Sequence, residues 1–116
     1  MTYVQGFLIP VPKDKREDYR KMAEAGWPAF KRLGAISTME GFAHDVPRGE
    51  HTDFYRAVKA QEGEEVVFSW IVWPDEDTYK KAFEAMMDEP EFQNMDMPFD
   101  GKRMMWGGFE PIFEGS

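Results

Sequence analysis

The ten-residue stretch EEVVFSWIVW, residues 64–73, constrains the fold more than any other part of the sequence. It has branched and aromatic residues at both odd and even positions, and the side chains of a strand alternate between two faces. The stretch therefore predicts a strand that is apolar on both sides and needs a cover on each of them. The residues of one face are Val66, Phe68, Trp70 and Val72, and those of the other are Val67, Ile71 and Trp73.

The rest of the chain predicts three more strands and two helices around this strand. Short β-prone runs bounded by proline or glycine indicate strands, and apolar residues at helical spacing indicate helices. The other predicted strands cover residues 3–11, 35–46 and 102–113, and the predicted helices cover residues 14–33 and 76–89. This order is the ferredoxin-like βαββαβ pattern, an α+β fold with an antiparallel sheet and two helices on one face. A chain of 116 residues is expected to form a single domain, residues 1–116.

Local signals predict where the helices begin and end. Asp14 with Glu17 three residues later resembles a capping box, and Asp75 is a favourable N-cap for the second helix. Pro28 has no backbone N–H, so a kink or a break is expected there, and Pro90 is expected to stop the second helix.

The segment TDFYRAVKA, residues 52–60, does not fit this order of elements. Its alternation is sufficient for a strand, but one more full strand would reverse the direction of residues 64–73. We therefore expect a short excursion, a bent strand end or a turn of helix.

The two halves of the chain resemble each other, and the difference between them locates a loop. YRKMAEA at residue 19 and YKKAFEA at residue 79 are similar, as are EGF at residue 40 and GGF at residue 107. The second half has seven more residues between these motifs, within residues 88–101. Because insertions concentrate in loops, and loops often carry function, this loop is expected to border a functional site.

Three long motifs resemble a known protein family. HTDFYRAVKA, EEVVFSW and MPFDGKRM, the last followed by GGFE, are similar to the YbaA-like family of uncharacterised bacterial proteins, a family of unknown function. The resemblance covers essentially the whole chain. It implies the fold of the dimeric α+β barrel superfamily, in which two ferredoxin-like sheets face each other across a homodimer. It implies no activity.

Composition narrows the choice of partners and location. The formal net charge is −8, which disfavours binding to nucleic acid or to anionic lipid. The chain has no cysteine, in keeping with a reducing compartment, and it has no run of 18 apolar residues. We expect a cytoplasmic protein with no membrane and no nucleic-acid partner. No cofactor is expected either, because Gly107 and Gly108 lie inside a predicted strand and do not open a helix as in a phosphate-binding loop.

Glu40 and His44 are the candidate catalytic residues. Glu40 lies in the middle of a predicted strand, where a buried carboxyl with a raised pKa could act as a general base, or where it could face solvent or pair with a lysine. His44, together with His51, Asp45 and Asp53, could bind a divalent metal. We favour a solvated turn and expect no metal site, because these residues are adjacent in sequence and share no fixed register.

Arg103 and Asp100 are candidate ligand-binding residues beside the 88–101 loop. The guanidinium of Arg103 could hold a substrate carboxylate in a bidentate manner, or it could pair structurally with an acidic side chain. Trp70, Trp106 and Met105 could line an apolar pocket, or serve only core and interface packing.

Two hypotheses for the function follow. The first is a homodimer with a small-molecule pocket between the sheet and the 88–101 loop, which binds or transforms an apolar ligand with a polar group. The second is a structural or regulatory dimer without catalysis, whose apolar sheet face serves only dimerisation. The sequence leaves open whether the protein is an enzyme.

Overall fold

A computed structural model describes residues 2–116 of the chain. The strands are β1 (Tyr3–Pro12), β2 (Ser37–Phe42), β3 (Glu64–Trp73) and β4 (Met105–Phe109). The helices are α1 (Arg16–Arg32), α2 (Phe54–Ala57), α3 (Glu76–Ala85) and α4 (Pro90–Gln93). Three short 3-10 turns complete the list: η1 (Lys13–Lys15), η2 (Met86–Asp88) and η3 (Gly101–Arg103).

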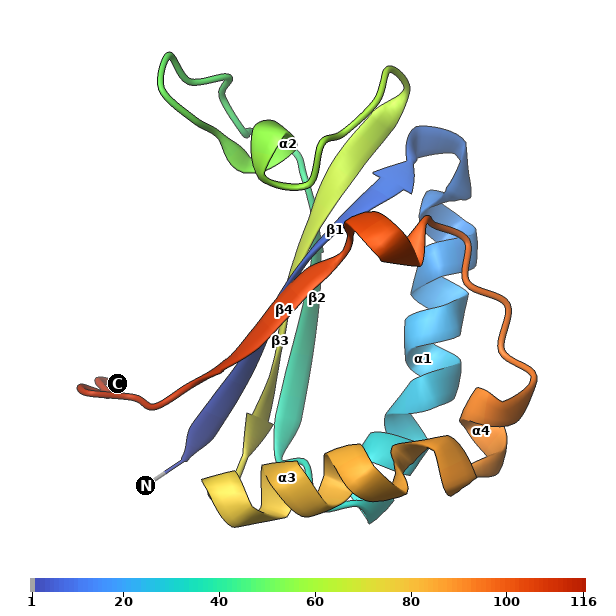
Figure 1. Ribbon diagram of the computed structural model, residues 1–116, viewed down its shortest axis with the longest axis vertical. Helices are drawn as coiled ribbons and strands as arrows, with labels where there is room; N and C mark the ends of the chain where they lie inside the picture. The colour runs from blue at the N-terminus through green and yellow to red at the C-terminus, as the bar shows by residue number, and fades with distance from the viewer. Residues whose placement is uncertain (1) are drawn as a thin grey trace.

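The four strands form one antiparallel sheet in the order β2-β3-β1-β4. Helices α1 and α3 lie on one side of this sheet, with α1 running alongside the strands and α3 crossing near one end (Figure 1). This arrangement confirms the predicted ferredoxin-like α+β fold.

Strand β1 lies between β3 and β4, yet it contains two prolines near its end. Pro10 and Pro12 pair with Val66 and Glu64 of β3, whereas the pairing of β1 with β4 extends only to Leu8 and Met105. The second half of β1 is therefore an edge on the β4 side, and an edge tolerates a residue that lacks a backbone N–H.

The core lies between the sheet and the helices. Two buried clusters form it, Ile9, Val11, Tyr19 and Val67 at one end and Ala35, Ile71, Trp73 and Ala82 at the other. The odd-numbered residues of β3 face these clusters, as the alternation predicts. Trp73 is completely buried, and its indole N–H donates to Oε1 of Gln5 at 3.2 Å, so the polar group of this large side chain is satisfied.

The segment 52–60 forms a turn of helix, which is one of the three predicted alternatives. Helix α2 begins after Asp53, whose side chain accepts from the backbone N–H of Arg56. It packs Tyr55 and Val58 against Val66 of β3. Helix α2 thereby covers one end of the sheet face that lies opposite α1.

Of the predictions about α1, the capping box is wrong, and of the kink or break predicted at Pro28 the break does not occur. The capping box of Asp14 and Glu17 does not form, because η1 precedes the helix and the N-cap position of α1 is Lys15. Helix α1 continues unbroken through Pro28. Packing of the neighbouring residues Gly26 and Ala29 against the body of the protein outweighs the loss of one helical hydrogen bond.

Later boundaries also differ from the prediction. Pro90 does not simply end the second helix; it occupies the first turn of α4, where its missing N–H costs nothing. The last strand is only Met105–Phe109, because η3 replaces its beginning and residues 110–116 leave the sheet. Strand β2 is likewise shorter than predicted and ends at Phe42. The N-cap predicted at Asp75 is confirmed, since its carboxylate accepts from the N–H of Thr78.

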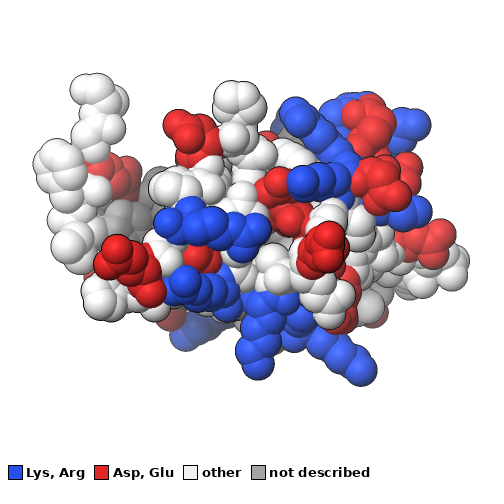
Figure 2. Space-filling view, turned by 90° about the horizontal axis from the view of Figure 1, so that it is seen from above, with Lys and Arg blue, Asp and Glu red and all other residues white. Residues whose placement is uncertain are grey.

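The end of the molecule near η1 and α2 has a mixed charge pattern. Figure 2 shows Lys and Arg side chains standing beside Asp and Glu side chains on this face. Several of them are paired, including Lys13 with Glu65 and Arg103 with Glu64. Across residues 2–116, no helix is both long enough and apolar enough to cross a bilayer.

Candidate functional site

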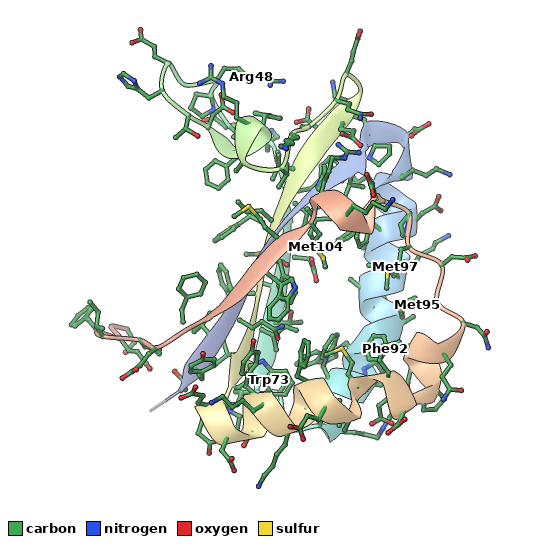
Figure 3. All side chains as sticks on the ribbon, viewed as in Figure 1. Arg48, Trp73, Phe92, Met95, Met97 and Met104 are labelled. Atoms are coloured by element: carbon green, nitrogen blue, oxygen red, sulfur yellow. The ribbon has the colours of Figure 1, made fainter. Side chains whose placement is uncertain are left out.

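A cavity of about 670 Å³ lies between the sheet and α1. Its floor comes from odd-numbered residues of β1 and β3 and even-numbered residues of β2, and one side comes from α1. The segment 86–104, which contains the loop with seven additional residues, supplies the remaining wall. Figure 3 shows Phe92, Met95, Met97 and Met104 of this segment spaced along α1 toward β4.

The walls of the cavity consist mainly of methionine and aromatic side chains. The methionines are Met22, Met86, Met87, Met95, Met97 and Met104, and the aromatic residues include Phe7, Trp27, Phe30, Phe42, Phe92 and Phe99. Unbranched thioether side chains change rotamer at little cost, so a wall of this kind adapts to the shape of an apolar molecule. Such a composition is typical of ligand cavities.

Glu40 of β2 and Tyr19 of α1 are the central polar pair of the cavity. The Tyr19 hydroxyl donates to Oε1 of Glu40 at 2.7 Å. Glu40 lies opposite Ser69 in the β2–β3 register. The carboxyl is thus held by the hydroxyl of Tyr19 and lies beside that of Ser69, at the floor of an otherwise apolar space.

The carboxyl of Glu40 is accessible and desolvated at the same time. Its side chain is exposed because it faces the open cavity. The surrounding protein atoms still displace water, and this desolvation raises the pKa of Glu40, although hydrogen bonds from Tyr19 and Ser69 act in the opposite direction. Burial, reinforced by the charge of Glu40, raises the pKa of Tyr19, so this phenol stays a donor. A raised pKa on an accessible carboxyl is the property expected of a general base.

Charged residues of α1 lie at the mouth of the cavity. The guanidinium of Arg16 stacks over the Phe42 ring at 5.0 Å from its centre. Arg20 is held by Glu17 and Glu24 in the same helix. The mouth is therefore polar and the interior apolar, apart from the Glu40 group.

Arg103 and Asp100 lie outside the lining of this cavity, as the described residues define it. The Arg103 guanidinium donates in a bidentate manner to Glu64, at 2.6 and 2.8 Å, and its Nε donates to Asp100 at 3.0 Å. Another of its N–H groups reaches the carbonyl of Lys59. These contacts tie the 100–103 turn to the start of β3, and they leave the guanidinium little capacity for a ligand.

The other predicted residues are distributed over both faces of the sheet. Trp70 and Met105 have the register of the face opposite α1, whereas Trp106 faces the helix side and its ring contacts Phe83 at the edge of α3. His44 follows β2 and lines a separate, smaller groove. Among residues 2–116, no group of three or more His, Cys, Asp or Glu side chains is placed to hold a metal ion.

Sequence reasoning missed Tyr19 and the methionines of the 86–97 segment as cavity residues. Tyr19 has the helical spacing of a core residue, and only its distance to Glu40 reveals a second role. Met86 and Met87 have the spacing of an apolar helix face and predict packing. The accumulation of nine methionines in 116 residues is the one signal that could have indicated an adaptable cavity.

The ferredoxin-like α+β fold is shared by solved structures of other proteins. A crystal structure of an EthD-family protein from Bacillus halodurans matches 97% of this chain and all of its own, with a TM-score of 0.58 and 15% sequence identity. SnoaB from Streptomyces nogalater, a cofactor-independent oxygenase, matches 97% of this chain and 95% of its own, with a TM-score of 0.54 and 12% identity. At such low identity these similarities concern the fold alone.

Residues 2–101 match the family of proteins of unknown function DUF1428, and the chain belongs to this family. It is 50% identical to the uncharacterised protein YbaA of Escherichia coli K12, over 98% of this chain and 99% of that protein. YbaA of Shigella flexneri is similar to the same extent. The resemblance drawn from three sequence motifs is thereby confirmed.

Proposed function

We propose that the protein binds a small apolar molecule with one polar, proton-donating group in the cavity between the sheet, α1 and the 86–104 segment. The observation that carries this proposal is the Glu40 carboxyl, which is accessible, desolvated and hydrogen-bonded by Tyr19 inside walls of methionine and aromatic residues.

The roles of the polar residues follow from their chemistry. Tyr19 occupies Oε1 of Glu40 and fixes the orientation of the carboxyl, which leaves acceptor capacity on the carboxylate for a ligand. An O–H or an acidic C–H of the ligand is the complementary donor. Glu40 accepts a hydrogen bond from this donor or removes its proton, and the raised pKa makes its carboxylate a stronger base. Of the residues predicted to be catalytic, Glu40 keeps this role, and His44 lies in a different groove.

The similarity to SnoaB is compatible with chemistry in such a cavity without a cofactor. It is a similarity of fold, and the same fold carries many functions, so it supports the class of site and no particular reaction.

We also propose that the protein is a cytoplasmic homodimer formed through the sheet face opposite α1. Phe68 and Phe109 on this face are 47% and 62% exposed, and Phe54 and Met105 are similarly accessible. Apolar surface of this density on a sheet is typical of an interface. The same observation favours the second candidate function, a structural or regulatory dimer without catalysis, which needs the face but not the cavity.

Native mass spectrometry of the freshly purified protein is the first experiment. A dimer that carries a reproducible additional mass supports both parts of the proposal. A clean apo dimer favours the structural dimer, and a monomer contradicts dimerisation.

A matched pair of ligands then tests the polar group. Calorimetry with 2-naphthol and with 2-methoxynaphthalene compares two flat apolar molecules that differ in one O–H donor. We expect 2-naphthol to bind more tightly, and we expect this preference to shrink in Glu40→Gln and to persist in the control Glu84→Gln, on the exposed surface of α3. Equal affinities in the wild type, or a preference unchanged by Glu40→Gln, would refute the role of Glu40.

A further inference from the structure

The segment that follows β4 exposes two large apolar side chains. Ile112 is 98% exposed and Phe113 is 84% exposed, the highest values among the large apolar residues of the described chain. We call residues 110–116 the tail. Figure 1 shows the tail running away from α1 and α3, on the opposite side of the sheet. Its position is fixed near the start of β1, where the Thr2 hydroxyl donates to Glu114 at 2.6 Å.

A small apolar groove lies on the same side of the sheet. Its volume is about 230 Å³, and we call it the α2 groove because it lies between the end of β2 and α2. Its lining residues are Gly41, Phe42, Ala43, His44, Val46, Phe54, Val66 and Phe68. The rings of Phe54 and Phe68 meet edge to face with centres 6.3 Å apart, which leaves ring surface for a further aromatic side chain.

The tail and the α2 groove occupy diagonally opposite corners of this sheet face. The tail leaves β4, one edge strand, at the end where β1 begins, and the groove adjoins β2, the other edge strand, at the end where β1 finishes. The tail therefore lies at the far corner of this face from the groove of its own chain, and Figure 1 shows the tail and α2 at opposite ends of the sheet.

Symmetry relates these two corners when two copies stack sheet against sheet. The tail and the groove lie at the two ends of one diagonal of the sheet face. A twofold axis that runs between the two sheets along the other diagonal places the tail of each copy opposite the groove of its partner. The strands of the two sheets then cross at a large angle, as in orthogonal sheet packing. A closed dimer of this kind makes two identical contacts between tail and groove.

We propose that the tail of each protomer docks in the α2 groove of a second copy, with Phe113 or Ile112 packed against Phe54 and Phe68. This inference rests on the homodimer proposed above and adds the segments that hold it together. The occupant of the groove is a second copy, because the tail lies at the far corner from the groove of its own chain. The twofold axis brings it to the groove of the partner.

The exposed area supports the same occupant. Aromatic side chains present 150–250 Å² each, so the exposed fractions of Phe54, Phe68, Met105, Phe109 and the tail amount to roughly 700 Å² per protomer, close to the ~800 Å² of a standard interface. Ile112 and Phe113 contribute roughly 300 Å² of this area on the same basis. A dimer without the tail contacts would lose a large share of its apolar interface.

Engineered cysteines test the contact directly, because the chain has none of its own. Protein with Phe113→Cys is mixed with protein carrying Ala43→Cys, oxidised under mild conditions and separated on a non-reducing gel. We expect a disulfide-linked heterodimer. The matched control is Phe113→Cys mixed with Glu84→Cys, whose cysteine lies on α3, and it should not cross-link.

Analytical sedimentation of the wild type and of Phe113→Asp tests tail docking separately from dimerisation. We expect a dimer whose dissociation constant rises at least tenfold in the variant. A monomeric wild type would overturn both proposals. A wild-type dimer with unchanged affinity in Phe113→Asp and no heterodimer on the gel would overturn only tail docking. A disulfide within one chain of the Ala43→Cys/Phe113→Cys protein would also overturn it.

Discussion

Gly26→Ala tests whether the outer wall of the cavity adapts. Gly26 is a buried residue in the middle of α1, where glycine is unfavourable, and it borders the cavity. A methyl group at this position would lie 3.3 Å from Cε1 of Phe92 and 3.4 Å from Cε of Met95. Both atoms belong to ends of side chains in the 86–104 wall. A shift of a few tenths of an ångström relieves the contact, and the cavity beside them offers the space.

The expected change is a modest gain in stability. Replacing glycine by alanine inside a helix is worth about 1 kcal/mol, and the small displacement of Phe92 and Met95 reduces this to about 0.5–1 kcal/mol. With an unfolding entropy of about 2.1 cal/mol/K per residue, the melting temperature of a 116-residue chain should rise by roughly 2–4 °C.

Thermal unfolding followed by circular dichroism measures this change, and Gly34→Ala is the matched control. Gly34 has φ of +110°, and an added methyl would approach Cγ2 of Thr78 to 2.6 Å, so this variant should lose more than about 1 kcal/mol. A fall in the melting temperature of Gly26→Ala would refute the reasoning. It would mean that the wall is packed rigidly, as in a core where overpacking costs about 1–3 kcal/mol, and an adaptable ligand site would then be unsupported.

Three further changes have defined outcomes. Desolvation raises the pKa of Glu40, so the folded protein binds its proton more tightly than the unfolded chain, and this residue's contribution to stability falls as pH rises from the ordinary glutamate pKa through the raised one. Glu40→Gln should therefore become more stable relative to the wild type as pH rises, in urea unfolding from pH 4 to 8; a constant difference would contradict the raised pKa. Trp73→Ala removes a completely buried side chain and should cost about 3–5 kcal/mol in the same assay, and a cost below about 1 kcal/mol would show that the site collapses or refills. Arg103→Lys keeps the charge but loses the bidentate contact with Glu64, so the unfolding midpoint should fall while binding of 2-naphthol is unchanged; weakened binding would restore Arg103 as a ligand residue.

The elements that follow from short-range patterns were predictable. Strand β3 has the predicted bounds, Glu64–Trp73, because its apolar character on both faces leaves little alternative. The N-cap at Asp75 is equally local, since its carboxylate needs only the N–H of Thr78 three residues later. Asp14 failed as a cap because a 3-10 turn competes with the helix at that point, and sequence patterns discriminate weakly between the two.

The candidate site could be predicted only in part, because distant segments assemble it. Glu40 was a candidate from its place in a strand, but its partner Tyr19 lies 21 residues away on another element. Arg103 had two open interpretations, and the choice between a ligand and a structural ion pair depends on Glu64, 39 residues earlier. Contacts between residues this far apart in sequence depend on how α1 and the 86–104 segment pack against the sheet. Local periodicity carries no information about that packing.

The central position of β1 has a consequence for synthesis. This strand leaves the ribosome before the other three, and both of its neighbours, β3 and β4, come from the later part of the chain. At about 5–20 residues per second, the roughly fifty residues between β1 and β3 take about 3–10 s to be made, and β1 has no strand partner during this time. Pro10 and Pro12 cannot donate hydrogen bonds to a foreign strand, and they interrupt an apolar run that would otherwise be prone to aggregate. We therefore expect the two prolines, which the folded sheet tolerates at an open edge, to reduce aggregation of the nascent chain.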